Sequence, residues 1–327
     1  MHALQYDRFG PPTDVLRHAA ATPRPLGPQE VRLRLTHRPI NPADLLEIRG
    51  RYGIRPDLPA IGGHEGVGVV EAVGEEVTGW SEGDRAVPLA AGPTWQTHLT
   101  TTPDKLFRPP DALPDEAAAQ LFVNPVTAAL LLDVVDAPRG SWVLCTAANG
   151  AVARFALQLG KRAGLRVAGL ARRTVSAEDL TALGYDAAFT FEEGDDPDPV
   201  RRAIQDATGG LAGVLDAVAG DTGALTASCL ADRGAMAVYG VLSGRSIALA
   251  AGPLLFRQAS VQGVWRTKWW SEAPADARLH MLKRVTDAFM SEHMSAPVVA
   301  RHPLSDFRSA LAEHARSGRL GKVLLVS

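Results

Sequence analysis

Between residues 142 and 239 the chain alternates short apolar runs with amphipathic stretches, and no other feature constrains the fold as strongly. The runs predict strands at 142–146, 165–170, 187–191, 213–217 and 235–239, and the amphipathic stretches predict helices at 152–164, 176–183 and 200–207. Strands that alternate with helices form a parallel sheet covered by helices. This part of the chain is therefore predicted to be a doubly wound α/β domain.

The segments on either side have a different pattern. From residue 1 to about residue 110 the apolar runs are short, and residues 30–35 alternate charged and apolar side chains as a half-buried strand does. The glycines at 66–83 are typical of bulges and barrel corners. Two amphipathic helices (275–294 and 304–316) and a strand at 321–326 are expected near the carboxyl terminus. We predict a small, partly open barrel in the first segment.

Composition argues against a nucleic-acid-binding, a disulfide-rich or a membrane-spanning protein. The 327 residues suit about two domains at about 150 residues each. Thirty-four Lys and Arg against 36 Asp and Glu leave a net charge of −2, and no run of like charges indicates a nucleic-acid partner. Cys145 and Cys229 are too few for a disulfide framework, and no apolar run approaches the roughly 18 residues of a membrane helix. We expect a cytoplasmic protein with neither a nucleic-acid nor a membrane partner.

The loop after the first strand of the parallel sheet is a candidate dinucleotide site. Backbone N–H groups and the helix dipole converge on a pyrophosphate at such a loop. Residues 146–153 match the glycine-rich fingerprint poorly, since only Gly150 is glycine, and an ordinary turn in a cofactor-free fold is the alternative. Arg172 and Arg173 follow the next strand, where an NAD site carries an acid. Unless they are solvated surface residues, they favour the 2′-phosphate of NADPH.

Several segments in register resemble the medium-chain dehydrogenase/reductase superfamily, in its zinc-independent branch. They are residues 40–44, 49–53, 58–66, 121–128 and 263–270. More narrowly, they are similar to the trans-2-enoyl thioester reductases of mitochondrial fatty-acid synthesis, and the wider quinone oxidoreductase branch stays open. The resemblance implies a Rossmann NADP-binding domain (119–257) inserted into a GroES-like β-barrel catalytic domain (1–118 and 258–327). It also implies a homodimer.

The resemblance bears on metal binding as well. His64 stands where zinc alcohol dehydrogenases have a ligand histidine, but Asn41 and Asn124 stand at the cysteine positions, and amides are poor zinc ligands. Residues 91–107 contain no cysteine for a structural zinc lobe. We expect no metal, the alternative being one held by His64, Glu65 and His98.

Without a Lewis acid, the expected chemistry is hydride addition to an activated C=C bond. The resemblance assigns Tyr52 as the group that hydrogen-bonds the developing enolate or passes on a proton; a surface packing role is the alternative. Trp265 and Trp269 are expected to wall a pocket for an acyl chain, unless they belong to the core or to a dimer interface. The residues assigned to the cofactor are Asn41, Asn124, Thr127, Asn149, Gly150, Ala151, Val152, Arg172, Arg173, Tyr239, Gly240 and Lys322. Loop or cap hydrogen bonding is the alternative for Asn41, Asn124 and Thr127, and solvation is the alternative for Lys322.

The expected function is NADPH-dependent reduction of trans-2-enoyl thioesters linked to CoA or to an acyl carrier protein. A quinone or enone reductase with the same fold and cofactor is the nearest alternative, and a nonenzymatic NADPH-binding structural protein is an alternative of another class. One departure from the superfamily's sequence pattern affects all three of these expected functions. Residues 151–153 read Ala-Val-Ala where the superfamily has Gly-Val-Gly, so methyl groups approach the expected pyrophosphate site.

Overall fold

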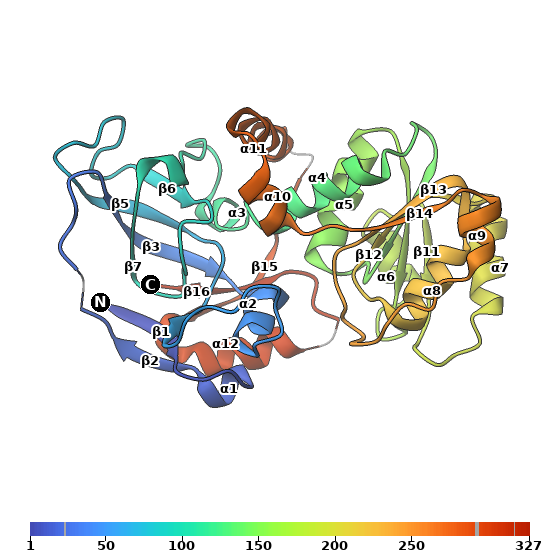
Figure 1. The fold of residues 1–327 in the computed structure, drawn as a ribbon, viewed down its shortest axis with the longest axis horizontal. Helices are drawn as coiled ribbons and strands as arrows, with labels where there is room; N and C mark the ends of the chain where they lie inside the picture. The colour runs from blue at the N-terminus through green and yellow to red at the C-terminus, as the bar shows by residue number, and fades with distance from the viewer. Residues whose placement is uncertain (23, 292–293, 317) are drawn as a thin grey trace. The chain divides into compact units, whose positions relative to one another are not determined.

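The computed structural model describes residues 1–22, 24–291, 294–316 and 318–327. They form two compact units, one of Met1–Val123 with Ala296–Ser327 and one of Asn124–Ser295 (Figure 1). The return to the first unit comes after residue 295, whereas the sequence analysis placed it at 258. Residues 258–295 stay with the second unit because β14 (Ser260–Gly263) extends its sheet and two helices that follow pack on its helix α4 (Asn124–Val135).

The first unit consists of two sheets and short helices. Its larger sheet has the order β15-β16-β3-β5-β6-β8, with β7 also paired to β3, and its smaller sheet has the order β2-β1-β4. The strands are β1 (His2–Tyr6), β2 (Arg17–Ala20), β3 (Val31–Pro39), β4 (Ala60–Ile61), β5 (Val67–Val73), β6 (Arg85–Pro88), β7 (His98–Thr101), β8 (Leu106–Phe107), β15 (Val298–Pro303) and β16 (Lys322–Val326). The helices are α1 (Pro12–Val15), α2 (Pro42–Ile48), α3 (Asp115–Ala118) and α12 (Phe307–Ala315), with single 3-10 turns at Pro103–Lys105 and Leu304–Asp306.

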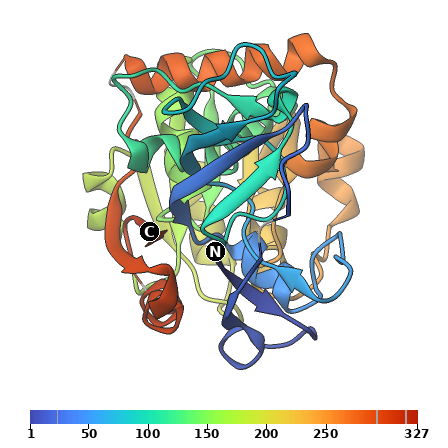
Figure 2. The same ribbon diagram turned by 90° about the vertical axis from the view of Figure 1, so that its left-hand side faces the viewer.

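The alternating pattern of residues 30–35 explains the core of the larger sheet. Val31, Leu33 and Leu35 are fully buried on one face of β3, in a cluster with Val70 and Leu99. The final strand β16 pairs antiparallel with the end of β3, so the carboxyl-terminal segment lies beside the amino-terminal strands (Figure 2). This long-range pairing brings residues near position 322 to residues near position 40.

The second unit is a six-stranded sheet with the order β11-β10-β9-β12-β13-β14, and every neighbouring pair is parallel. Its other strands are β9 (Trp142–Thr146), β10 (Arg166–Ala171), β11 (Ala187–Thr190), β12 (Leu211–Asp216) and β13 (Leu230–Val238). Its other helices are α5 (Ala151–Arg162), α6 (Ala177–Ala182), α7 (Asp198–Thr208), α8 (Gly220–Ser228), α9 (Ala251–Phe256), α10 (Arg266–Glu272) and α11 (Ala275–Met290). The chain starts at the centre of the sheet and winds outward in both directions, so the predicted doubly wound parallel sheet is confirmed.

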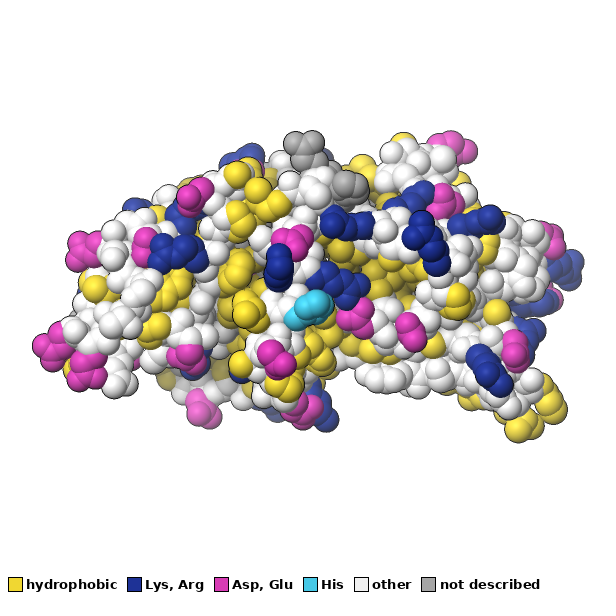
Figure 3. Space-filling view, turned by 90° about the horizontal axis from the view of Figure 1, so that it is seen from above, with side chains coloured by type: hydrophobic (Ala, Val, Ile, Leu, Met, Phe, Trp, Pro, Cys, Tyr) yellow, Lys and Arg dark blue, Asp and Glu magenta, His cyan; other side chains and the backbone are white. Residues whose placement is uncertain are grey.

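The surface agrees with the near-neutral composition. On the face shown in Figure 3, lysine and arginine side chains are interspersed with aspartate and glutamate side chains. Within the described parts of the chain, no helix has both the length and the apolar character needed to cross a bilayer.

Candidate active site

Tyr52, the expected catalytic residue, lies in the loop between α2 and β4 and packs against His64. The two ring centroids are 5.4 Å apart, and the rings are inclined by 46°. The turn that presents His64 depends on Gly63, which has φ +97° and whose added Cβ would come within 2.3 Å of the Trp95 ring. A close approach of backbone and Trp95 therefore sets the position of His64.

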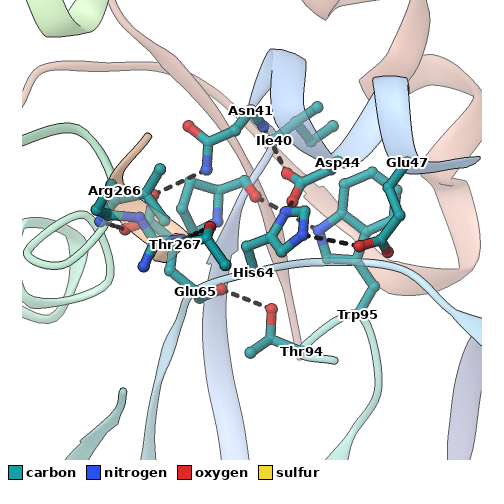
Figure 4. Close-up of polar contacts among 12 residues, drawn as sticks. Ile40, Asn41, Asp44, Glu47, His64, Glu65, Thr94, Trp95, Arg266 and Thr267 are labelled. Carbon is teal, nitrogen blue, oxygen red and sulfur yellow. Dashed lines mark hydrogen bonds and ion pairs between the residues drawn. The ribbon is translucent and has the colours of Figure 1, made fainter. Parts of the chain in front are cut away.

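Two carboxylates hold the His64 ring from both sides. Nδ1 lies 2.6 Å from Asp44 Oδ1, and Nε2 lies 2.9 Å from Glu47 Oε2 (Figure 4). Asp44 and Glu47 stand three residues apart on α2, so both side chains point from the same face of the helix. Burial alone lowers the pKa of His64, but the hydrogen bonds to both carboxylates outweigh it and raise the pKa to about 10. His64 is therefore an imidazolium at neutral pH, and both of its N–H groups donate.

A second buried network lies beside this one. Glu65 is fully buried and accepts hydrogen bonds from Asn41 Nδ2 at 2.8 Å and from the Val123 amide at 2.7 Å. The amine of Lys322 donates to Asn41 Oδ1 and, at 3.3 Å, to the Ile40 carbonyl. Burial raises the pKa of Glu65 and lowers that of Lys322 to about 8. Asn41 thus links a buried cation to a buried carboxylate.

Lys322 is not solvated, which was the alternative in the sequence analysis, and its assignment to the cofactor stays a prediction. Lys322 is only 4% exposed, and its amine faces Asn41 and Ile40 inside the first unit. The reason is the antiparallel pairing of β16 with β3, which carries Lys322 to the segment that follows β3.

The residues considered for a metal have other partners. Both ring nitrogens of His64 contact carboxylates, the Asn41 amide bonds Glu65, and His98 Nε2 lies 3.1 Å from Glu71. Across the residues that the structure describes, no group of three or more His, Cys, Asp or Glu side chains has an arrangement that could hold a metal ion. That the protein works without a metal stays a prediction.

In the second unit, the expected pyrophosphate loop connects β9 to α5. Ala147 has φ +47°, and the Ala148 backbone is held by the Leu170 carbonyl at 3.1 Å and by the Tyr185 hydroxyl at 2.8 Å. Gly150 is the N-cap of α5, and no side chain forms a cap hydrogen bond there. The first N–H groups of this 12-residue helix, at positions 151–153, precede the first bond within the helix, from the Arg154 N–H to the Gly150 carbonyl, and are available to an anion. The loop fits a dinucleotide pyrophosphate, and it gathers Asn149, Gly150, Ala151 and Val152.

Arg172 and Arg173 follow β10, the strand next to β9, and both are exposed. Their place at the end of this strand matches the position expected for a 2′-phosphate. The Arg173 guanidinium lies 2.5 Å from Asp195 Oδ2, and the Arg173 amide donates to Glu192 Oε1 at 2.8 Å. An acidic loop thus partly neutralises one of the two cations.

Sequence reasoning missed Asp216, which ends β12 and is fully buried. It accepts hydrogen bonds from the Thr146 hydroxyl at 2.8 Å and from the Ala219 amide at 2.9 Å, and burial raises its pKa. The signal available in the sequence was an acid at the end of an apolar strand. Asp216 ties the end of β9 to the loop that leads into α8.

The remaining expected residues all belong to the second unit. Tyr239 and Gly240 follow β13, and an added Cβ at Gly240 would come within 2.6 Å of the Ala217 carbonyl. Asn124 and Thr127 lie in the first turn of α4. Trp265 is the N-cap of α10, and Trp269 lies within that helix with its ring centroid 6.2 Å from that of Trp270. Asn41, Tyr52 and Lys322 belong to the first unit.

Comparisons with known proteins place the chain in a family. Residues 27–102 match the family model of the alcohol dehydrogenase GroES-like domain, and residues 151–282 match that of the zinc-binding dehydrogenases. The human protein named mitochondrial enoyl-[acyl-carrier-protein] reductase is 30% identical over 317 residues, which cover 95% of this chain and 84% of the human one. The chain belongs to the medium-chain dehydrogenase/reductase superfamily. This confirms the predicted family and its pairing of a GroES-like with a Rossmann-type domain.

Solved structures show the same fold. One, described as a candidate NADPH:quinone reductase from Bacillus thuringiensis, has a TM-score of 0.90 and 28% sequence identity, and the match covers 100% of this chain and 98% of the other. The mycobacterial protein Rv1454c, solved in complex with NADPH, has a TM-score of 0.87 and 26% identity, with 100% of both chains covered. The homologues and neighbours of this superfamily chain are thus named as oxidoreductases.

Proposed function

We propose that this protein is an NADPH-dependent reductase of the C=C bond of trans-2-enoyl thioesters. The observation that carries the proposal is the packing of the Tyr52 ring against His64, whose two ring nitrogens contact carboxylates. It supports Tyr52 as the phenol that donates a proton. The human relative named enoyl-[acyl-carrier-protein] reductase supports the thioester as substrate, and the NADPH complex of the mycobacterial neighbour supports the cofactor.

In the proposed reaction, some residues bind the cofactor and the acyl chain, and Tyr52 donates a proton. NADPH, when bound, supplies a hydride to the β-carbon of the enoyl group. The amides at the start of α5 bind the pyrophosphate, and Arg172 and Arg173 bind the 2′-phosphate. As negative charge develops on the thioester oxygen, the Tyr52 hydroxyl donates a hydrogen bond to it or passes a proton towards the α-carbon. Trp265 and Trp269 offer apolar surface to an acyl chain.

A quinone or enone reductase is the second candidate. The structural neighbour described as a quinone reductase supports it with the higher TM-score of the two structures above. Both candidates share the fold, the cofactor and the hydride step, so the acceptor distinguishes them.

Initial rates of absorbance loss at the nicotinamide band test the proposal directly. Purified protein is mixed with crotonyl-CoA or a longer enoyl-CoA, and NADPH is compared with NADH. We expect rapid oxidation of NADPH that depends on the enoyl-CoA, and much slower oxidation of NADH. Turnover of a quinone alone would move the assignment to the second candidate, and inactivity with both acceptors despite NADPH binding would favour a nonenzymatic protein.

The pair Arg172 and Arg173 gives a test of the cofactor site. In the variant R172A/R173A we expect the KM for NADPH to rise about 30-fold, or about 2 kcal/mol, because two exposed charge-assisted contacts to phosphate are lost. The KM for NADH should stay unchanged. Asp195→Asn should act in the opposite direction, because it frees Arg173. Arg202→Ala, which removes an exposed arginine on α7, is the matched control. An unchanged KM for NADPH in the double variant would contradict the assignment.

The proposal extends to assembly and location. We propose a homodimer, because β14 is the edge strand of the parallel sheet and α9, which precedes it, exposes Leu255 (67%) and Phe256 (82%). Phe256→Glu should then yield a monomer in size-exclusion chromatography with light scattering.

For the location of the protein in the cell we propose the cytoplasm, since Cys145 and Cys229 are both buried and unpaired, as is usual in a reducing compartment.

A further inference from the structure

The loop that carries Tyr52 has little regular structure of its own. Gly50 precedes the tyrosine with φ +69°, Gly53 follows it, and Ile54 is 47% exposed. Backbone hydrogen bonds from Gly50 to the Glu47 carbonyl and from Arg51 to the Leu46 carbonyl, each 2.8 Å, attach the start of the loop to α2. A side chain in such a loop needs a rigid neighbour to keep one orientation.

His64 is a rigid neighbour of the kind required. Its ring nitrogens are held at 2.6 and 2.9 Å by carboxylates on opposite sides, so the ring can neither flip nor rotate without breaking an ion pair (Figure 4). Asp44 is itself fully buried and accepts a 2.7 Å hydrogen bond from the backbone N–H of Asn41, which fixes the carboxylate as well. The Tyr52 ring lies against this clamped imidazolium.

We propose that His64, clamped by Asp44 and Glu47, is a positioning residue that orients the Tyr52 hydroxyl for proton donation. The inference rests on the proposed function, because it assumes that Tyr52 is the donor. His64 itself touches no substrate in this mechanism. It acts by holding the phenol ring in one orientation, and a misplaced donor costs turnover rather than cofactor binding.

A double-mutant cycle tests this inference. His64→Gln removes the ring and its charge, and we expect kcat with enoyl-CoA to fall about tenfold while the KM for NADPH changes less than twofold. In a Tyr52→Phe background the same substitution should change kcat less than twofold, because the group that His64 orients is gone. His98→Gln is the matched control, since it removes another half-buried histidine that contacts a single carboxylate, and it should leave kcat unchanged.

A structural role alone predicts a different pattern. If His64→Gln lowers kcat by the same factor with and without the Tyr52 hydroxyl, or leaves kcat unchanged, the inference is wrong while the proposed function stands. If Tyr52→Phe keeps the full kcat, the proposed role of Tyr52 fails, and the inference fails with it. Should His64→Gln not fold, Glu47→Gln replaces it in the cycle, because it weakens the clamp on one side and keeps the pair with Asp44. The expected coupling to Tyr52→Phe then has the same sign and a smaller size.

Discussion

Replacing Tyr52 by phenylalanine is expected to lower kcat with enoyl-CoA by about 100-fold to 1000-fold, the usual loss when one donor to a developing oxyanion is removed. The phenol ring and its packing on His64 remain, so the substitution removes the hydroxyl alone. NADPH affinity should change less than twofold, since the expected cofactor contacts of the second unit are untouched. Stopped-flow or steady-state rates and an NADPH fluorescence titration measure the two quantities separately.

The control for this variant is Ile54→Ala in the same loop. Ile54 is 47% exposed, so its truncation tests whether any change in the loop lowers turnover. We expect its kcat to match that of the unmodified protein. Full turnover in Tyr52→Phe would remove the tyrosine from the mechanism.

Replacing Lys322 by methionine is expected to lower the free energy of unfolding by about 3–5 kcal/mol. The substitution leaves the Glu65 carboxyl without its cation, and Glu65 is fully buried. Urea unfolding followed by circular dichroism measures the loss. The double variant Glu65→Gln with Lys322→Met should recover much of it, because both charges are then absent.

The control is Lys283→Met, which removes an exposed lysine paired with Asp287 on α11. Exposed pairs contribute less than about 1 kcal/mol, so its stability should stay close to that of the unmodified protein. Equal stability of Lys322→Met and the unmodified protein would contradict the buried network as described.

The elements that sequence patterns predicted are those whose signal is local. The strand at 142–146 coincides with β9, and the expected helix at 152–164 overlaps α5. The helices α2 and α8 were missed. Helix α2 begins at Pro42, with Asn41 as its N-cap, and has only seven residues, which is too short for a clear periodic pattern. Helix α8 contains Gly220 and Gly223 and is mostly buried, so no polar face marks it. The edge strand β14 was placed in the wrong unit, because four residues carry no signal of which sheet they join.

In the candidate site, too, the sequence indicated some residues and missed others. The loop around Gly150 and the cations at 172–173 follow directly from strand ends in a parallel sheet, and the resemblance indicated Tyr52. The clamp on His64 was not predicted, although Asp44 and Glu47 stand three residues apart in the sequence. A spacing of three places two carboxylates on one helical face, but it does not tell which side chain lies between them.

The sequence by itself determined the five strands β9 to β13 of the parallel sheet and the helices α5, α6 and α7 between them, because periodicity acts over a few neighbouring residues. Only the tertiary structure decided which side chains meet. Lys322 reaches Asn41 across 281 positions of the chain, and Val123 reaches Glu65 across 58. Such contacts depend on the pairing of β16 with β3, which buries Lys322 beside Asn41, the residue that also donates to the Glu65 carboxylate.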